Sequence, residues 1–471
     1  LSTNLNVNSI EVNTTSGVVR GLTLQVLNKT VDQFLNIPFA EPPIGDLRFA
    51  PPVPLKQPIK CNSSITNGQM HTKTRVIRCR GGSLWRSCTD VIDGTKRRNS
   101  CMQSSESLTI SEDCLVLNIW TPNAGNNNTN KSQLKPIMFW IYGGGFVRGS
   151  IFFESYNGSI LATNDVVIVS TNYRLGPFGF LYGDREDAPG NVGFYDQLLG
   201  LKWVRENIHS FGGDRDQITI FGESAGSRSV SAHILSPLSK GLFRRAIMES
   251  GAHLFNKDRD VQSKAESIAQ GIQMAQHVNC SQTEHWLQCL RNISAEDMLK
   301  LSTKVISFPI LGTEFLPIGA QNAFKTQQLN SDINILSGIT RTEGSILAVQ
   351  YNYTNIKTID DFKTYIRAAE KRYHGLVADK VADFYLNGVD TGSPQALQWA
   401  FYQFFGDLLM GCPTYLFAKH MAAIGLQNNH NVYFYRLDYQ SQKQAIARSC
   451  NESTMENQMI YGPILLFLMY L

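Results

Sequence analysis

The chain has 471 residues, of which 42% are hydrophobic and 10% aromatic, while only 17% are charged. Globular proteins carry about 25% charged residues, so this composition describes a well-buried globule and excludes a disordered or fibrous chain. Lys and Arg outnumber Asp and Glu by 43 to 39, a formal net charge of +4, which argues against a protein that binds nucleic acid or another polyanion.

The predicted elements alternate between short apolar runs and helical patterns. In chain order, the runs that predict strands are residues 137–142, 166–173, 218–221, 333–338 and 432–437. Between the second and third of these runs, Leu198, Leu201 and Val204 recur at helical spacing within residues 196–209. Strand, helix and strand in succession predict a parallel sheet with right-handed crossovers, and uniformly apolar strands fit a sheet covered on both faces. We therefore expect a single α/β domain over residues 1–455.

Two segments depart from this pattern. Residues 60–99 are basic, contain Cys61, Cys79 and Cys88, and show little periodicity, so they predict a solvated insertion or, alternatively, a binding patch. Residues 456–471 form an apolar tail whose last twelve residues, 460–471, are too short to span a membrane. A buried strand, part of an anchor signal and sequence outside the fold are the three interpretations of this tail.

The cysteines and glycosylation sequons of the chain indicate an oxidising compartment. It has nine cysteines, and both disulfides and N-glycans are products of secretion. Asn-x-Ser/Thr sequons occur at Asn13, Asn28, Asn62, Asn127, Asn130, Asn157, Asn279, Asn292, Asn352 and Asn451. No stretch has the 18 or so apolar residues of a membrane helix. We expect a secreted, extracellular glycoprotein whose leader has been removed or whose sequence is a fragment, since residue 1 is Leu.

The most specific motif is the pentapeptide Gly222-Glu223-Ser224-Ala225-Gly226, which follows the predicted strand 218–221 and precedes a predicted helix over 227–235. Glycines on both sides of a serine at a strand-to-helix turn predict a nucleophile elbow, which presents the serine hydroxyl at the end of the sheet. The pentapeptide alone also fits an ordinary turn. Its place between a strand and a helix favours Ser224 as a nucleophile.

A glycine-rich segment, residues 143–145, follows the predicted strand that ends at Tyr142. Attack on an ester carbonyl produces an oxyanion, which needs N–H donors already in place. We expect the amides of Gly144, Gly145 and Ala225 to supply them. The alternatives are a flexible loop and a phosphate cradle, but the segment lacks the Lys-Ser/Thr pair of a phosphate loop.

A serine nucleophile needs a base, and the base needs an acid to orient it. With a nucleophile elbow the chain order is Ser, Asp or Glu, then His. Glu343 lies beyond the predicted strand 333–338 and is followed by Gly344. A lone carboxylate in a loop is also typical of a solvated surface, but its position after a strand makes Glu343 the candidate acid.

Several motifs in order resemble the type B carboxylesterase/cholinesterase family of α/β-hydrolases. They are Asn36-Ile-Pro-Phe-Ala-Glu-Pro-Pro43, Glu112-Asp-Cys-Leu-Val-Leu-Asn118, the glycine loop after Tyr142, Asn172-Tyr-Arg-Leu-Gly176, Gly190-Asn-Val-Gly193 and Phe221-Gly-Glu-Ser-Ala-Gly226. The resemblance runs from about Val18 to Thr454, apart from the basic segment.

This resemblance implies an α/β-hydrolase fold, with a large, mostly parallel central sheet and helices on both faces. It implies Ser224 as the nucleophile, Glu343 as the acid, and Gly144, Gly145 and Ala225 as the oxyanion hole. It also implies the disulfides Cys101–Cys114 and Cys280–Cys289, and it allows a third between Cys412 and Cys450. No metal or organic cofactor is expected.

The first departure from the family concerns choline esters. Cholinesterases place a tryptophan for the quaternary ammonium group inside the first disulfide loop, where the aromatic face attracts the cation. Residues 102–113, between Cys101 and Cys114, contain no aromatic residue. The sequence therefore favours a general carboxylesterase over an enzyme specific for choline esters.

The second departure concerns the base. The family's catalytic histidine lies in a His-Gly loop after the strand that residues 432–437 resemble, but residues 456–461 continue as Glu-Asn-Gln-Met-Ile-Tyr. The histidines after Glu343 are His374, His420 and His430, none of which matches the family's position, and we expect structural roles for all three. Loss of the base costs on the order of 10⁶ in turnover. We therefore expect a low-activity or incomplete form of an active enzyme.

The sequence predicts a serine carboxylic ester hydrolase that acts on a small-molecule ester through an acyl-enzyme on Ser224. The alternative is a catalytically inactive, cholinesterase-like adhesion or binding protein, which the missing base favours. The oligomeric state is left open.

Overall fold

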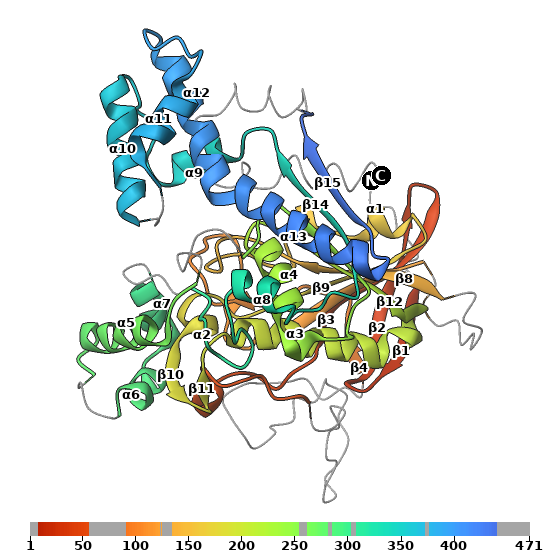
Figure 1. Ribbon diagram of the computed structural model, residues 1–471. Helices are drawn as coiled ribbons and strands as arrows, with labels where there is room; N and C mark the ends of the chain where they lie inside the picture. Colours follow the sequence, from red (N-terminus) through yellow and green to blue (C-terminus); the bar gives the residue numbers. More distant parts are fainter. Residues whose placement is uncertain are drawn as a thin grey trace, which may run out of the picture.

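A large mixed sheet forms the body of the protein in the computed structural model, which describes residues 8–55, 91–122, 124, 134–253, 261–280, 285–302, 308–372 and 376–439 (Figure 1). Across these residues the sheet has eleven strands, in the order β1-β2-β3-β7-β9-β8-β12-β13-β14-β15, with β4 beside β2. Their bounds are Ser9–Thr14 (β1), Gly17–Val26 (β2), Lys29–Pro38 (β3), Val91–Asp93 (β4), Val116–Thr121 (β7), Lys135–Ile141 (β8), Val167–Thr171 (β9), Gly213–Glu223 (β12), Arg245–Glu249 (β13), Asn334–Thr340 (β14) and Val432–Leu437 (β15). Two small pairs lie outside it, Ser100–Cys101 (β5) with Ile110–Ser111 (β6), and Tyr182–Arg185 (β10) with Ala188–Pro189 (β11).

The sheet divides into an antiparallel and a parallel part. Strands β1, β2, β3, β7 and β9 pair antiparallel in turn, whereas β9, β8, β12, β13, β14 and β15 are all parallel. All five predicted strands belong to the parallel part. Because parallel strands end at one edge of the sheet, the segments after β8, β12, β13 and β14 meet there.

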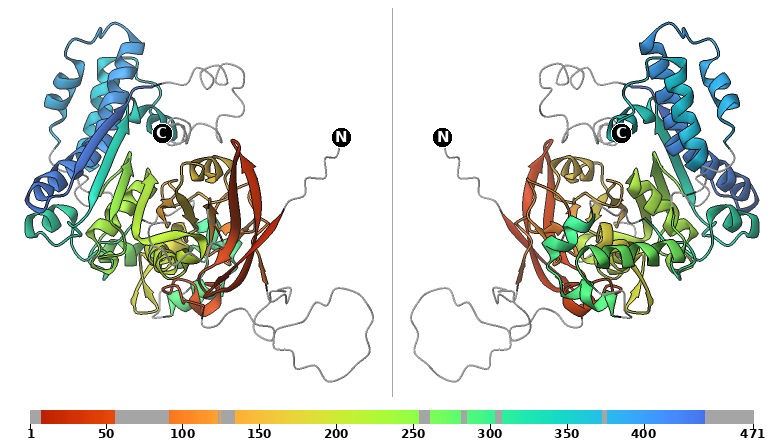
Figure 2. Two further views of the ribbon diagram at one scale, coloured as in Figure 1. Left: turned by 90° about the vertical axis from the view of Figure 1, so that its right-hand side faces the viewer. Right: turned by 90° about the vertical axis from the view of Figure 1, so that its left-hand side faces the viewer.

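The helices pack around the sheet (Figures 1 and 2). Their bounds are Ser159–Ala162 (α1), Gly176–Phe180 (α2), Val192–Asn207 (α3), Ala225–Leu235 (α4), Lys264–His277 (α5), Trp286–Asn292 (α6), Ala295–Ser302 (α7), Ala320–Thr326 (α8), Glu343–Gln350 (α9), Ile359–Arg372 (α10), Ala378–Leu386 (α11), Pro394–Gly406 (α12) and Cys412–Asn428 (α13). A π-helical turn, Asp407–Gly411 (η6), joins α12 to α13. The helices predicted over 196–209 and 227–235 correspond to α3 and α4, with shifts of a few residues at their ends.

The main core lies between the sheet and these helices. Every residue of β9 is buried, as expected for a strand covered on both faces. A separate apolar core, which includes Phe362, Phe401 and Phe405, holds α9 to α12 together. This helical group lies at the opposite side of the molecule from β1 to β3 (Figure 2). No helix in the described ranges combines the length and apolar character needed to cross a bilayer.

The two unusual segments fall largely outside the described residues. Of residues 60–99, only 91–99 are described; Val91–Asp93 form β4, which pairs in parallel with β2, and the Arg97 side chain makes an ion pair with Glu154. Cys61, Cys79, Cys88, Cys450, the His71 and His374 side chains, four of the sequons (Asn62, Asn127, Asn130 and Asn451) and the tail 456–471 lie outside the described ranges.

Candidate active site

Ser224 lies at a sharp turn between β12 and α4. Its backbone has φ 55° and ψ −118°, a region that a residue with a side chain enters only when its surroundings enforce it. The surroundings hold both ends of the residue: the Ser224 amide donates to the carbonyl of Glu249 (2.9 Å), and its carbonyl accepts from the Arg228 amide (2.9 Å). Ser224 therefore has the strained backbone of a nucleophile elbow.

The flanking glycines make the turn possible. A Cβ at Gly222 would lie 2.6 Å from the carbonyl oxygen of Ile141, and one at Gly226 would overlap that same oxygen. Ile141 is the last residue of β8, so α4 begins in direct contact with the backbone of the neighbouring strand. Glycine at both positions is a steric requirement of the elbow.

The glycine loop packs directly against the elbow. A Cβ at Gly143 would lie 3.0 Å from the Cβ of Ser224 and 2.9 Å from Oε2 of Glu223. Gly144 and Gly145 follow with φ values of 111° and 64°, which glycine adopts without strain. The predicted donors Gly144, Gly145 and Ala225 thus belong to two segments in contact at Ser224, and Ala225 is the first residue of α4, where amides lack partners within the helix.

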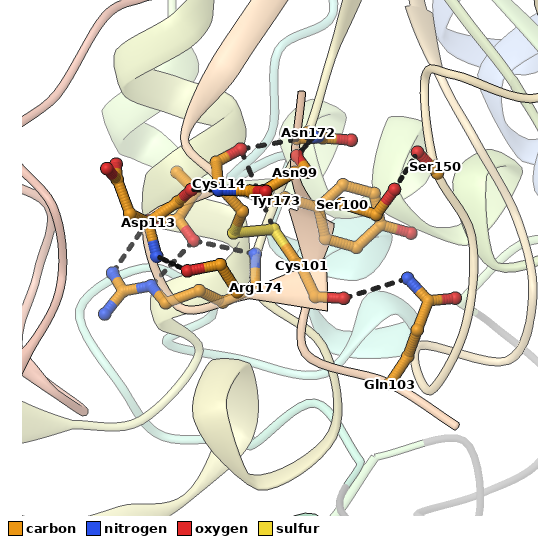
Figure 3. Close-up of a disulfide and its surroundings, with 12 residues drawn as sticks. Asn99, Ser100, Cys101, Gln103, Asp113, Cys114, Ser150, Asn172, Tyr173 and Arg174 are labelled. Atoms are coloured by element: carbon orange, nitrogen blue, oxygen red, sulfur yellow. Dashed lines mark hydrogen bonds and ion pairs between the residues drawn. A yellow bond between two sulfur atoms is a disulfide. The ribbon is translucent and has the colours of Figure 1, made fainter. Parts of the chain in front are cut away.

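The first disulfide loop contacts the segment that follows the glycine loop, and Figure 3 shows Ser150 of this segment beside Ser100 and the Cys101–Cys114 disulfide. The structure contains the Cys101–Cys114 and Cys280–Cys289 disulfides. The Gln103 amide group bonds both backbone groups of Gly149, at 2.8 and 2.7 Å, and the hydroxyls of Ser100 and Ser150 lie 2.7 Å apart. These contacts anchor the segment that follows the glycines. Cys412 is a free thiol among the described residues.

Glu343 is the first residue of α9, at the same edge of the sheet. Its Oε1 accepts hydrogen bonds from the Ser250 hydroxyl and from the Thr340 amide, both at 2.6 Å. Ser250 directly follows Glu249, whose carbonyl binds the Ser224 amide. Glu343 therefore lies on the side of the elbow away from β8. The contacts that link it to Ser224 run through Ser250 and Glu249.

Sequence reasoning missed a row of residues that crosses four strands beside Glu343. Glu223, Glu249, Gly338 and Tyr435 are successive register partners on β12, β13, β14 and β15; we call these four residues the carboxyl row. A Cβ at Gly338 would overlap the Tyr435 ring, so the glycine leaves the space that the ring occupies. The signal available in the sequence was Glu249-Ser250-Gly251 directly after the apolar residues 246–248.

The carboxyl groups at this edge have different environments. Oε2 of Glu223 and Oε2 of Glu249 are buried and accept no hydrogen bond from any described residue. Burial, followed by the nearby charge of Glu343, raises the pKa of Glu223 to about 8. Burial and the charge of Glu223 raise the pKa of Glu249 well above its ordinary value.

Glu343 differs because two donors stabilise its charged form. Burial raises its pKa, whereas the hydrogen bonds from Ser250 and Thr340 lower it. Carboxyl groups whose surroundings separate their pKa values in this way take different roles. Glu343 is therefore the member of the group whose charged form has hydrogen-bond donors, whereas burial favours the protonated forms of Glu223 and Glu249.

The described histidines after Glu343 make other contacts. The His420 ring stacks on Phe324 with 5.0 Å between ring centres, and Nε2 of His430 lies 2.6 Å from Oδ1 of Asp332. Earlier in the chain, buried His233 bonds Ser239 and Gln197, and burial lowers its pKa to about 3. These imidazoles are engaged away from Ser224 and Glu343.

The sheet with its strand-turn-helix elbow and the carboxylate beyond β14 defines the protein as an α/β-hydrolase. A model of the carboxylesterase family matches residues 8–69 and 84–466. The chain belongs to this carboxylesterase family, and its relatives are cholinesterases and carboxylesterases. The family is one of carboxylic ester hydrolases.

Three relatives show how the similarity is distributed. An acetylcholinesterase 4 of Caenorhabditis briggsae is 35% identical over 76% of this chain and 56% of its own length. A cholinesterase of Mus musculus is 32% identical over 92% of this chain and 70% of its own. A pyrethroid hydrolase of Rattus norvegicus is 34% identical over 91% and 72%, respectively. The chain thus spans just over half of the first relative and about seven-tenths of the other two.

Proposed function

We propose that this chain is a serine carboxylic ester hydrolase whose nucleophile is Ser224. The Ser224 hydroxyl attacks the ester carbonyl, the alcohol leaves, and water releases the acid from the acyl-enzyme. The backbone amides of Gly144, Gly145 and Ala225 donate hydrogen bonds to the oxyanion of the tetrahedral intermediate. The observation that carries this proposal is the contact of the glycine loop with the elbow, 3.0 Å between the Ser224 Cβ and the position of a Gly143 Cβ.

Glu343 is the acid of the proposed site, and Ser250 is a positioning residue. The 2.6 Å hydrogen bond from Ser250 fixes the direction of the Glu343 carboxylate. Since Ser250 and Glu249 are neighbours in the chain, and the Glu249 carbonyl holds the Ser224 amide, one segment sets the position of both the acid and the nucleophile.

The proposed substrate is a small-molecule ester without a choline group. The first disulfide loop, residues 102–113, supplies no aromatic face for a quaternary ammonium ion. We propose that the protein is secreted; the two disulfides among the described residues support this.

For these 471 residues taken by themselves, as a low-activity or incomplete form, turnover is proposed to be slow. No histidine of the sequence matches the family's position, and His420 and His430 are engaged elsewhere. Without the base, the oxyanion hole and substrate binding leave a rate about 10³ to 10⁴ above that in water. Because His420 and His430 contact other residues, they also favour a second candidate function. This is a binding protein that keeps the fold but does not turn over esters.

A fluorophosphonate probe separates the two functions. We expect slow covalent labelling of the wild-type chain and none of Ser224→Ala. Ser210→Ala is the matched control, because Ser210 precedes β12 whereas Ser224 follows it, so this variant should label like the wild type. Absence of labelling in the wild type, together with absence of p-nitrophenyl ester hydrolysis, would reject the hydrolase in favour of the binding protein.

A further inference from the structure

We propose that Asn13, Asn28, Asn279, Asn292 and Asn352 carry N-linked oligosaccharides and that Asn157 does not. All six are sequon asparagines within the described residues. The first five have exposed side chains, whereas that of Asn157 is half-buried. The proposal is independent of the chemistry at Ser224.

The attachment chemistry requires an accessible amide. The Nδ2 atom of asparagine attacks the anomeric carbon of a lipid-diphosphate oligosaccharide, so that a C–N bond forms, the C–O bond to the diphosphate breaks, and Nδ2 loses a proton. The lipid diphosphate is the leaving group. Because the product is bulky and hydrated, the folded protein accommodates it only at its surface.

Three of the five asparagines lie at turns that point their side chains outward. Asn28, Asn279 and Asn352 have φ values of 61°, 55° and 59°, the left-handed conformation that asparagine tolerates in turns. Asn28 occupies the two-residue turn of the β2–β3 hairpin, where Val26 pairs with Lys29. Asn13 lies on β1, the outermost strand at one end of the described sheet, and Asn292 ends α6.

Two of these sequons adjoin apolar side chains that the fold leaves in water. Leu27, next to Asn28, is 70% exposed, and Tyr351, next to Asn352, is 47% exposed. An oligosaccharide at each position would cover the neighbouring apolar surface. One at Asn13 would hinder pairing of another strand with the edge of β1, a recurrent source of aggregation.

The Asn157 sequon packs against strands β7 and β9 of the sheet. Oδ1 of Asn157 accepts a hydrogen bond from the Ser159 amide at 3.0 Å, and Ser159 is itself buried. Between them, Gly158 leaves no room for even a Cβ, which would lie 2.7 Å from Ile168 and 2.8 Å from Trp120. This tripeptide therefore serves as an internal negative control.

The test is to express the 471-residue chain behind a cleavable leader in a secreting eukaryotic cell and map each site. Release of the glycans by a peptide amidase in ¹⁸O-water converts each occupied asparagine to labelled aspartate. We expect the label at the five exposed asparagines and not at Asn157. A glycan at Asn157, or its absence from any of the five, would overturn the proposal.

The covering role has its own test. Asn28→Gln and Thr30→Ala both remove the sequon at Asn28, and Asn352→Gln and Thr354→Ala both remove the sequon at Asn352. Equal retention within each pair excludes an effect of the substituted side chain itself. We expect stronger retention on a hydrophobic column for all four variants. Asn292→Gln, whose neighbours Arg291 and Ile293 are not exposed, should elute like the wild type; equal retention of all five variants would reject the covering role. Ser294→Ala is unsuitable because Ser294 caps α7.

Discussion

The two sides of the candidate site are held by different forces. On the nucleophile side, which comprises the glycine loop and residues 222–226, backbones touch so closely that Gly143, Gly222 and Gly226 have no room for a Cβ. On the acid side, Glu343 is held by side-chain and backbone hydrogen bonds from Ser250 and Thr340, next to two buried carboxyl groups. The comparison teaches that steric fit between backbones fixes the geometry of the nucleophile side. On the acid side, the geometry depends on hydrogen bonds and on the protonation of the carboxyl groups.

The largest effect is expected from Gly226→Ala on the nucleophile side. The added Cβ overlaps the carbonyl of Ile141, and overpacking against backbone costs about 3 kcal/mol or more. Urea unfolding should show this loss, together with loss of fluorophosphonate labelling. Gly319→Ala is the control, since its nearest neighbour would be Leu311 at 3.8 Å; equal stability of the two variants would contradict the steric account.

The next effect is the pH dependence imposed by the buried carboxyl group of Glu223, which lies where the two sides meet. The ordinary pKa of Glu223 is 4.5, and burial raises it to about 8 in the folded protein. The folded state therefore holds a proton that the unfolded state has lost between these values. This contribution to stability is complete below pH 4.5 and is lost as the pH rises through 8, at about 1.4 kcal/mol per pH unit.

Glu223→Gln should remove this contribution to the pH dependence. Between pH 6 and pH 8 the free energy of unfolding of the wild type should fall by roughly 2 kcal/mol more than that of the variant. Urea titrations at pH 5, 6, 7 and 8 measure the difference. Parallel curves for the two proteins would show that Glu223 is ionised in the folded state at neutral pH.

An intermediate effect is expected from Gly338→Ala in the carboxyl row. Its Cβ would displace the Tyr435 ring, at a cost of about 2 kcal/mol. Tyr435→Phe keeps the ring and should cost less than half as much. If Gly338→Ala were no more destabilising than Tyr435→Phe, the ring would not depend on the space above the glycine.

The smallest effect is expected from Ser250→Ala, which removes one of the two hydrogen bonds to Glu343. The loss should be about 1.5 kcal/mol, the lower end of the range for a hydrogen bond to a charged group, and the pKa of Glu343 should rise. Ser345→Ala, whose hydroxyl donates to the neutral carbonyl of Thr342 at 3.0 Å in the same helix, is the matched control. An equal loss in both variants would mean that Glu343 carries no charge.

The same contrast explains what the sequence could predict. Residues 222–226 and 143–145 are short motifs whose glycines imply a tight turn by themselves, and the structure places them in contact. The position of Glu343 after a strand was predictable as well, because parallel strands end at one edge of the sheet. Roles for Ser224, Glu343 and the three amides stay proposals.

The carboxyl row could not be predicted because it depends on register. Glu223 and Tyr435 come together only because β12, β13, β14 and β15 align in that order, and no local pattern states which residues of distant strands become partners. The helical group α9 to α12 was missed for a similar reason. Its core depends on contacts such as Phe362 with Phe401, between helices whose packing the strand pattern does not indicate.

The most direct test of the central claim is a crystal structure of the chain after reaction with a fluorophosphonate. The account predicts a phosphonyl group on Ser224 Oγ, with its oxygen about 3 Å from the amides of Gly144, Gly145 and Ala225. An adduct on another residue, or a phosphonyl oxygen directed into solvent away from the glycine loop, would contradict it.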